Sequence, residues 1–301
     1  MEIGLGLDSR FTLSGSDQRL IAQEAAGLGY QSLWTPIGAE RTPFDLCELW
    51  YRASGLATGI AVAPLSSWTL EQLATTASET AERCEHTFRL GVGSGRKAGA
   101  VIRDMRVARG ALDIGGLPIY LGALGPQMLR LGGELYDGVA LNWCSSAQVA
   151  WSRKQVAAGA RKVGVDASAV RIHEYIRVCV DEDHGAARAA FAKMVMTYAM
   201  ARPGTDKTKG YRAHFARMGF DEILTDLERR RAAGADDGEL ARRFPDELLA
   251  TVGYWGRPEG ARAAFLRLAE GLDIAIVRLV PARGNDAAAV RTAMRACAPR
   301  T

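Results

Sequence analysis

The sequence lacks the features that mark several large classes of protein. Its 301 residues contain no run of about 18 apolar residues, the length that a membrane-spanning helix needs. Neither the Gly-x-Ser-x-Gly turn of α/β-hydrolases nor the Gly-x-x-x-x-Gly-Lys-Ser/Thr phosphate loop occurs. Residues 1–7 lead straight into a strand-like segment without the charged and apolar regions of a signal peptide, so we expect a cytoplasmic protein with no membrane partner.

Cysteine, histidine and net charge are also low. The five cysteines include no Cys-x-x-Cys pair, which fits reduced thiols better than a disulfide framework. The four histidines show no His-x-x-x-His or Cys–His ligand spacing, and His173 and Glu174, adjacent on a predicted strand, point to opposite faces, so no metal site is expected. The net charge of +4, from 38 Lys and Arg against 34 Asp and Glu, is too small and too scattered to predict a nucleic-acid partner.

What the sequence does have is a regular alternation of strand-like and helix-like segments. We predict strands over residues 3–7, 32–35, 59–63, 87–92, 119–121, 139–141, 170–180 and 274–280. We predict helices over residues 17–28, 44–56, 69–83, 98–112, 126–133, 145–163, 181–200, 258–271 and 286–297. Residues 202–256 contain no convincing strand and are interpreted as two or three additional helices.

Eight strands that are each followed by a helix indicate an α/β fold, a single (β/α)₈ TIM barrel over residues 1–301, with a helical insertion at about 202–256. An open, doubly wound sheet is the alternative, but eight consecutive units without a domain break favour closure. In a barrel the functional site lies at the C-terminal ends of the strands. Two Gly-rich turns, after residues 92 and 121, are expected at that end.

The stretch from residue 118 to residue 143 combines a buried strand, a tight turn at residues 122–126 and a helix that begins at Pro126. Proline suits the first helical position because its missing N–H would be unpaired there in any case. The free N–H groups and the positive end of the helix dipole then point at one place, which predicts a phosphate site. A tight connection without a ligand is the alternative interpretation.

Three motifs carry a resemblance to a known family. They are Gly-Tyr-Gln-Ser-Leu-Trp at residues 29–34, Gly-Val-Gly-Ser-Gly at residues 91–95, and Tyr-Leu-Gly-Ala-Leu-Gly-Pro at residues 120–126 with Asp-Gly-Val at residues 137–139. In this order, within a barrel, the sequence resembles the luciferase-like monooxygenase superfamily, especially its coenzyme F420-dependent (5-deazaflavin) oxidoreductases. The resemblance covers most of the chain and is least clear over residues 202–256.

The resemblance implies that the barrel mouth holds a flavin or a deazaflavin. The turn at residues 122–126 would bind the cofactor phosphate through backbone N–H groups, and residues 93–95 would lie along the cofactor. A bulge with a non-prolyl cis peptide at Ala61–Val62 would support the ring. The residues assigned to cofactor binding are Ala61, Val62, Gly93, Ser94, Gly95, Arg96, Gly122, Ala123, Leu124, Gly125, Pro126, Met128 and Asn142. For Asn142 and Trp143, which end a strand, simple packing is the alternative.

The sequence departs from the family's sugar-phosphate dehydrogenases in two places. Their Asp-His pair is replaced by Ile37 and Gly38, and their Glu after the strand-four glycines is replaced by Arg96. Sugar-phosphate dehydrogenation is therefore not expected. Glu40 is the nearest acid to the missing pair and is the candidate for proton transfer, with a solvated loop acid as the alternative. Arg96 is either a partner for an anionic group or a surface arginine.

These observations predict an oxidoreductase that transfers a hydride between coenzyme F420 and a small organic substrate. The alternatives are an FMN-dependent monooxygenase and a flavin-binding barrel without turnover. The resemblance also implies a homodimer. Apolar side chains of the insertion, Phe215, Met218, Phe220 and Tyr254, are expected to supply surface for the dimer contact.

Overall fold

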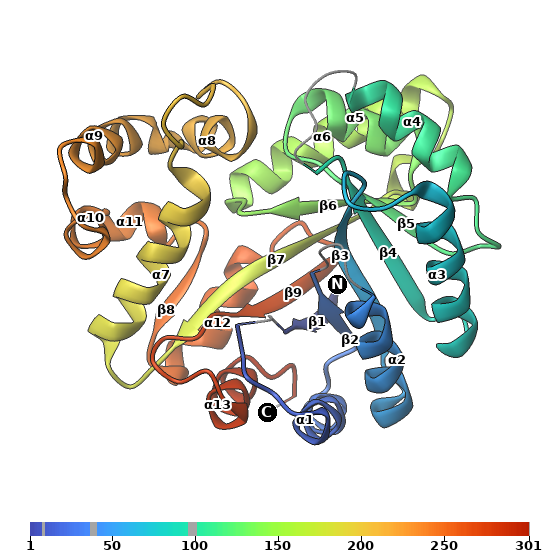
Figure 1. Ribbon diagram of the computed structural model, residues 1–301, viewed down its shortest axis with the longest axis horizontal. Coiled ribbons are helices and arrows are strands. Elements are labelled where there is room, and N and C mark those ends of the chain that lie inside the picture. Colours follow the sequence, from blue (N-terminus) through green and yellow to red (C-terminus); the bar gives the residue numbers. More distant parts are fainter. Residues whose placement is uncertain (8–9, 37–40, 96–100, 301) are drawn as a thin grey trace.

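The computed structural model describes residues 1–7, 10–36, 41–95 and 101–300, and its centre is a closed ring of eight parallel strands (Figure 1). The ring strands are β1 (Glu2–Gly6), β2 (Ser32–Thr35), β3 (Ala57–Pro64), β4 (Phe88–Gly93), β5 (Ile119–Gly122), β6 (Gly138–Asn142), β7 (Arg171–Val180) and β9 (Ile274–Leu279). Strands pair in chain order from β1 to β7, and β9 closes the ring by pairing with both β7 and β1. The predicted TIM barrel is confirmed.

Helices cover the outside of the ring between successive strands. They are α1 (Gly15–Gly27), α2 (Thr42–Ser54), α3 (Leu70–Arg83), α4 (Val101–Ala111), α5 (Pro126–Leu135), α6 (Ser146–Lys162), α7 (His184–Ala199), α12 (Pro258–Leu268) and α13 (Ala287–Ala296), with a 3-10 turn, η1 (Ala167–Ala169), before β7. Thr69 and Ser145 cap α3 and α6 by accepting hydrogen bonds from the N–H groups of Gln72 and Gln148. None of the helices in the described ranges is long and apolar enough to cross a membrane.

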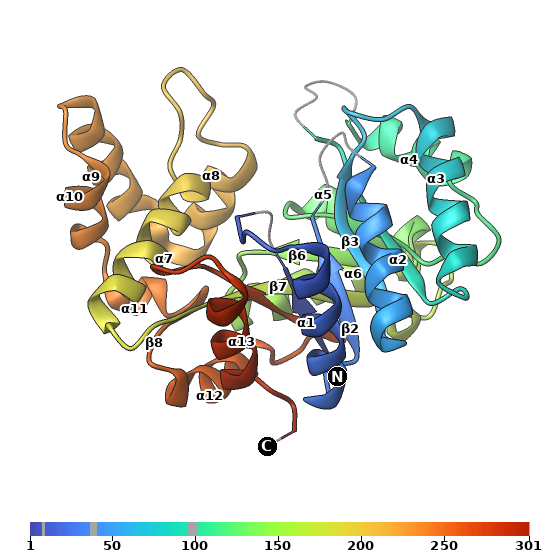
Figure 2. The ribbon, with the colours of Figure 1, turned by 60° about the horizontal axis from the view of Figure 1, so that its bottom comes forward.

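The segment after α7 forms an insertion of short helices. These are α8 (Gly210–Phe215), the π-helical η2 (Ala216–Phe220), α9 (Asp221–Ala232), α10 (Asp237–Arg243) and α11 (Asp246–Leu249). Figures 1 and 2 show α9 and α10 at the opposite end of the molecule from α2 and α3. The predicted helical insertion is confirmed, but it holds four α-helices and a π-helical turn rather than two or three helices.

The prediction that this region holds no strand is wrong. A short strand, β8 (Gly253–Gly256), pairs in parallel with the second half of β7, from Arg177 to Val180. Its four residues, Gly-Tyr-Trp-Gly, offer only two side chains with a preference for strands, so its sequence signal is weak. The pairing is imposed by β7, which continues beyond the end of β6 and leaves an edge there.

The glycine pair in α5 was expected to end that helix, and this is also wrong. The helix continues to Leu135, with Gly132 and Gly133 buried inside it. A Cβ atom on Gly133 would lie 2.0 Å from the carbonyl oxygen of Val156, and one on Gly159 would lie 1.9 Å from that of Arg130. These glycines therefore let α5 and α6 pack backbone to backbone.

The insertion has its own hydrophobic core, built with α7 and Trp143. Phe215 and Phe220 are fully buried in it, and Met218 and Tyr254 are half-buried. The expectation of exposed apolar surface is therefore wrong for Phe215 and Phe220, which fill the molecule's own interior, and Met218 and Tyr254 offer only part of their surface. The argument for a dimer contact at this place loses its support.

Candidate functional site

Strand alternation decides which side chains enter the barrel lumen. Leu33, Val92, Val139 and Val277 belong to the core between ring and helices, so their neighbours in each strand face inward. Toward the N-terminal ends of the strands, His173 stacks on Tyr120 with ring centres 4.7 Å apart and meets the edge of Trp34, also at 4.7 Å. Burial lowers the pKa of His173 to about 3, so this imidazole is a neutral filler.

Above this layer, the β3–β5 side of the lumen is lined by small residues around Val62. The register between β3 and β4 shifts between Ile60 and Ala63, and the Ala61–Val62 peptide is cis, as the resemblance implied. A Cβ atom on Gly91 would lie 2.9 Å from Val62, on Gly93 3.0 Å and on Gly122 3.4 Å. Gly91 and Gly93 of the Gly-Val-Gly-Ser-Gly motif thus leave room for the Val62 side chain of the bulge.

The β6–β7 side of the lumen carries a polar network instead. Asn142, at the end of β6, accepts a hydrogen bond through Oδ1 from Nη1 of Arg177. Its Nδ2 donates to the hydroxyl of Tyr211 from α8, at 2.5 Å. The Arg177 guanidinium lies over the Trp143 ring, 4.1 Å from its centroid, and Nη1 also donates to the Tyr175 carbonyl at 2.9 Å. The β3–β5 half of the upper lumen is therefore lined by small residues, and the β6–β7 half is rich in hydrogen-bond donors.

The predicted phosphate turn has the geometry of an open helix N-terminus. Gly125 is the N-cap residue of α5, and no side chain caps the helix. Among the described residues, no acceptor pairs with the backbone N–H groups of Leu124, Gly125, Gln127 or Met128. A Cβ atom on Gly125 would meet nothing within 4 Å. Several donors thus converge where there is room for a ligand.

The insertion is tied to the same turn. Nη2 of Arg217, in η2, donates to the Leu124 carbonyl at 2.9 Å and lies 3.4 Å from Nδ1 of His214. The other ring nitrogen of His214, Nε2, lies 2.8 Å from the Trp143 carbonyl. Burial lowers the pKa of His214 to about 4, which leaves it neutral near pH 7. His214 therefore adds no charge here, and Arg217 is the group of this network that brings a positive charge into contact with the phosphate turn.

A buried carboxyl lies behind the network, on the outer face of β7. Glu174 accepts a hydrogen bond from the Cys144 N–H at 2.6 Å. Burial raises the pKa of Glu174 to about 8, against the opposing effects of the Cys144 bond and the Arg177 charge. The predicted opposite placement of His173 and Glu174 is confirmed. No group of three or more His, Cys, Asp and Glu residues that could hold a metal ion occurs within the described part of the chain.

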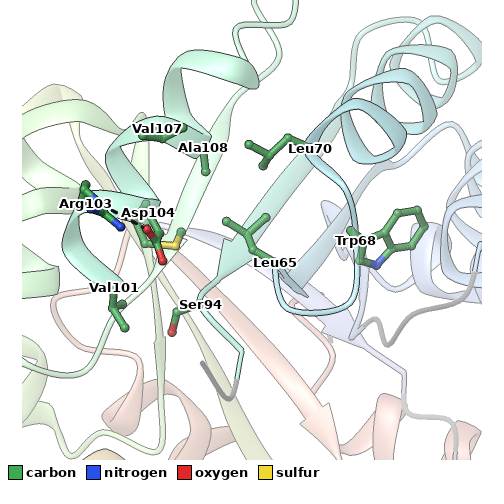
Figure 3. Close-up of a pocket in the computed structure, with 10 residues that line it drawn as sticks. Leu65, Trp68, Leu70, Ser94, Val101, Arg103, Asp104, Val107 and Ala108 are labelled. Carbon is green, nitrogen blue, oxygen red and sulfur yellow. Dashed lines mark ion pairs between the residues drawn. The ribbon is translucent and has the colours of Figure 1, made fainter. Parts of the chain in front are cut away.

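The motif residues assigned to the cofactor lie near one another at the mouth, with differences in detail. Ala61, Val62, Gly93, Gly122 and Asn142 belong to the upper lumen. Ser94 lines a pocket of about 380 Å³ at the barrel rim. Figure 3 shows Leu65 and Leu70 facing Val107 and Ala108 of α4 across this pocket, whose lining is mainly apolar.

Other assigned residues are less well placed or undescribed. Gly95 has φ +67°, and a Cβ atom there would lie 2.0 Å from the Ser66 hydroxyl, so the turn needs glycine. Met128 packs against the main core. Trp143 is fully buried among Phe191, Tyr198 and Phe215. Glu40 and Arg96, with Ile37 and Gly38, lie outside the described residues.

Sequence reasoning missed three residues of this site: Arg177, Tyr211 and Arg217. Arg177 carries a usable signal, because a charged residue inside a ten-residue Ile- and Val-rich strand, two positions after Tyr175, must share its inward face. Tyr211 and Arg217 come from the insertion, whose placement over the mouth no local pattern announces.

Comparisons with known proteins show which family the chain matches. Residues 96–273 match the family model described as luciferase-like monooxygenase. The 5,10-methylenetetrahydromethanopterin reductase of Methanolobus tindarius is 31% identical over 174 residues, or 58% of this chain and 50% of that protein. The chain thus matches about half the length of this curated relative.

Two solved structures share the fold. The coenzyme F420-dependent tetrahydromethanopterin reductase of Methanopyrus kandleri superposes with a TM-score of 0.75 at 14% identity, covering 97% of each chain. The oxygenating constituent of 3,6-diketocamphane monooxygenase from Pseudomonas putida, in complex with FMN, gives 0.63 at 13% identity, covering 100% of this chain and 97% of that one. Because the family model matches more than half of the sequence, the chain belongs to the luciferase-like monooxygenase family.

Proposed function

We propose that this protein is an oxidoreductase that transfers a hydride between coenzyme F420 and a small organic substrate at the C-terminal mouth of the barrel. The observation that carries the proposal is the open N-terminus of α5 beside the small-residue half of the upper lumen. The similarity to 5,10-methylenetetrahydromethanopterin reductase and to the F420-dependent enzyme of Methanopyrus kandleri supports F420 as the cofactor.

The residues at the mouth fit a phosphate-bearing, flat cofactor. The N–H groups of Leu124, Gly125 and Gln127 supply donors for the phosphate, with the helix dipole and the Arg217 charge nearby. Gly93 and Gly122 have no side chain, so nothing projects into the lumen from them beside Val62. In this proposal Ala61 and Val62 support the ring, and Asn142 lies at its polar edge.

The cofactor supplies the two-electron chemistry when bound, so the chain's own residues bind, orient and exclude water. Tyr211 and Arg217 bring the insertion over the mouth, where it shields the site from solvent. Asn142 is held in one orientation by Arg177 and Tyr211 and offers a fixed amide at the mouth. Glu40 remains our candidate for moving a proton to or from the substrate.

Absorbance titration of the purified protein with F420 and with FMN tests the proposal. We expect F420 to bind at least about tenfold more tightly, a difference of about 1.4 kcal/mol. Tighter binding of FMN, with oxygen consumption, would instead support the monooxygenase alternative that the 3,6-diketocamphane enzyme suggests. If F420 binds, but no alcohol tested reduces it and no aldehyde or imine tested oxidises its reduced form, the result would support a flavin-binding barrel without turnover.

We further propose a cytoplasmic homodimer. Five free, buried cysteines suit a reducing compartment, and the family resemblance supports the dimer. Light scattering over a range of protein concentrations checks the dimer, and a constant monomer mass would exclude it.

A further inference from the structure

Arg177 is a charged side chain in an unusual place. It lies on the inward face of β7, is 5% exposed, and pairs in register with Arg278 of β9. Burial and the neighbouring Arg278 charge both lower its pKa, and Tyr198, Tyr211 and Glu174 oppose that change. A guanidinium nevertheless stays protonated in proteins, so a full positive charge is held at the mouth. Such a charge is costly unless an anion accompanies it.

The hydrogen bonds of Arg177 leave one edge of the guanidinium unused. Nη1 donates to Asn142 and to the Tyr175 carbonyl. Within the described ranges, no acceptor pairs with Nε or Nη2, and no carboxylate forms an ion pair with this side chain. The Nε–Nη2 edge is one that can bind a carboxylate with two parallel hydrogen bonds.

The nearby carboxyl of Glu174 does not serve as the counter-ion. It lies on the outer face of β7, and one of its oxygens accepts from the Cys144 N–H. With its pKa raised to about 8, it is mostly protonated near pH 7. Among the residues that the structure describes, no carboxylate therefore compensates the positive charge of Arg177 on the lumen side.

The Asn142 amide orients the Tyr211 hydroxyl so that it becomes a second donor in the same place. Its Oδ1 accepts from Arg177, so its Nδ2 must be the atom that donates to the Tyr211 oxygen. Tyr211 is an acceptor in that bond, and its own O–H hydrogen is left for another partner. No acceptor for it occurs among the described residues. Arg177 and Tyr211 together present unused hydrogen-bond donors beside a positive charge, which favours an anionic oxygen group.

We propose that Arg177, with Tyr211, binds a carboxylate group of the substrate, so that the substrate is an organic acid. Asn142 positions both side chains, and Trp143 supports the guanidinium from below. The inference rests on the proposed function in one respect: that function makes the bound acid the substrate of hydride transfer. The site would prefer a carboxylate to the amide of the same shape, because an uncharged amide cannot neutralise the Arg177 guanidinium.

Calorimetric titration with small carboxylates and their amides tests the inference. The probes are acetate, butyrate and benzoate against acetamide, butyramide and benzamide, with and without bound F420. We expect each carboxylate that binds to do so at least about tenfold more tightly than its amide. The Arg177→Gln protein should lose that preference while its amide affinity stays within about twofold, and Arg177→Lys should keep part of it.

Two further variants keep the result interpretable. Tyr211→Phe removes one hydroxyl, conserves the ring, and should weaken carboxylate binding about three- to fivefold, a loss typical of one hydrogen bond. Arg171→Gln is the matched control, since Arg171 lies on the same strand but at the opposite end, in an ion pair with Glu2. It should leave the preference for carboxylates unchanged.

Several outcomes overturn the inference. Equal affinity for acids and amides removes the carboxylate site, as does an Arg177→Gln protein that keeps the preference. If Arg177→Gln changed only the ratio of the affinities for reduced and oxidised F420, the Arg177 charge would act on the cofactor ring and not on a substrate carboxylate. By contrast, a protein that discriminates acids from amides but binds neither F420 nor FMN would keep the anion site and refute the proposed oxidoreductase.

Discussion

Arg217 and Leu124, which are 93 residues apart in the chain, are joined by a hydrogen bond of 2.9 Å from guanidinium to carbonyl. The bond occupies the carbonyl of a turn whose N–H groups are open, and it brings a positive charge to the same place. The insertion therefore contributes to the proposed cofactor site rather than forming a separate appendage.

The first prediction is that Arg217→Gln weakens binding of the phosphorylated cofactors. Charge-assisted hydrogen bonds contribute about 1.5–3 kcal/mol, and exposure of Arg217 reduces this, so we expect a loss of about five- to tenfold. Affinity for the dephosphorylated forms of F420 and FMN should stay unchanged. Arg229→Gln, on exposed α9, is the control. Equal losses for phosphorylated and dephosphorylated ligands would show that Arg217 acts only on structure.

The second prediction concerns Gly125→Asp. The backbone of Gly125 is extended, with φ −98°, and its added side chain would meet open space, so we expect the melting temperature to hold. The new carboxylate would occupy and repel the phosphate site, and cofactor affinity should fall more than about tenfold. Gly125→Ala is the matched control and should bind normally. A folded Gly125→Asp protein with wild-type affinity for both cofactors would move the phosphate elsewhere.

The third prediction separates the packing role of the glycine motif from binding. Gly93→Ala should lower the free energy of unfolding by about 1–3 kcal/mol, because the new methyl group lies 3.0 Å from Val62. In a Val62→Ala background the same change should cost little, since the obstructing side chain is gone. Urea unfolding of the four proteins in this cycle gives the coupling energy. Additive effects would contradict the contact.

The fourth prediction is a pH dependence of stability caused by His173. Its pKa is depressed in the folded protein to about 3, so below about pH 6.5 the unfolded chain binds a proton that the folded chain does not. Stability from this group is complete above pH 6.5 and falls by at most about 1.4 kcal/mol per pH unit below it.

Other groups act in the same range, so the measurement must be a difference. His214, with a pKa near 4, adds a slope of the same sign, whereas Glu174, raised to about 8, opposes it. His173→Phe keeps a ring against Tyr120 and removes the titration. Urea unfolding between about pH 7 and pH 5 gives the slope of the free energy of unfolding against pH. In this variant the slope should correspond to about one fewer proton taken up on unfolding. Parallel pH curves for variant and wild type would contradict a neutral buried His173.

The sequence was sufficient for features that depend on neighbours along the chain. The Thr69 cap, the buried strand before Gly122 and the start of α5 at Pro126 all follow from local chemistry and are present. Gly132 and Gly133 show where this reasoning fails. A glycine pair has the same local signature whether it ends a helix or lets a second helix approach.

The candidate site was predicted only on the side that its motifs form. Val62 and Gly122 belong to short local patterns, whereas Arg177, Tyr211 and Arg217 act through contacts that span 35 to 93 residues of sequence. Such contacts depend on how the insertion packs against the ring, which periodicity and turn chemistry do not encode. Their discovery needed the three-dimensional arrangement.

The change of partner along β7 has a consequence for how new activities could arise in this protein. The backbone ladder between β6 and β7 ends at Asn142 and Tyr175, and from Arg177 onward β7 pairs with β8. At the mouth, the seam between β6 and β7 is bridged by the side chains of Asn142 and Arg177 rather than by main-chain bonds. Substitution there can reshape the opening while the ring below keeps all of its ladders, so substrate range and scaffold integrity are separable by mutation.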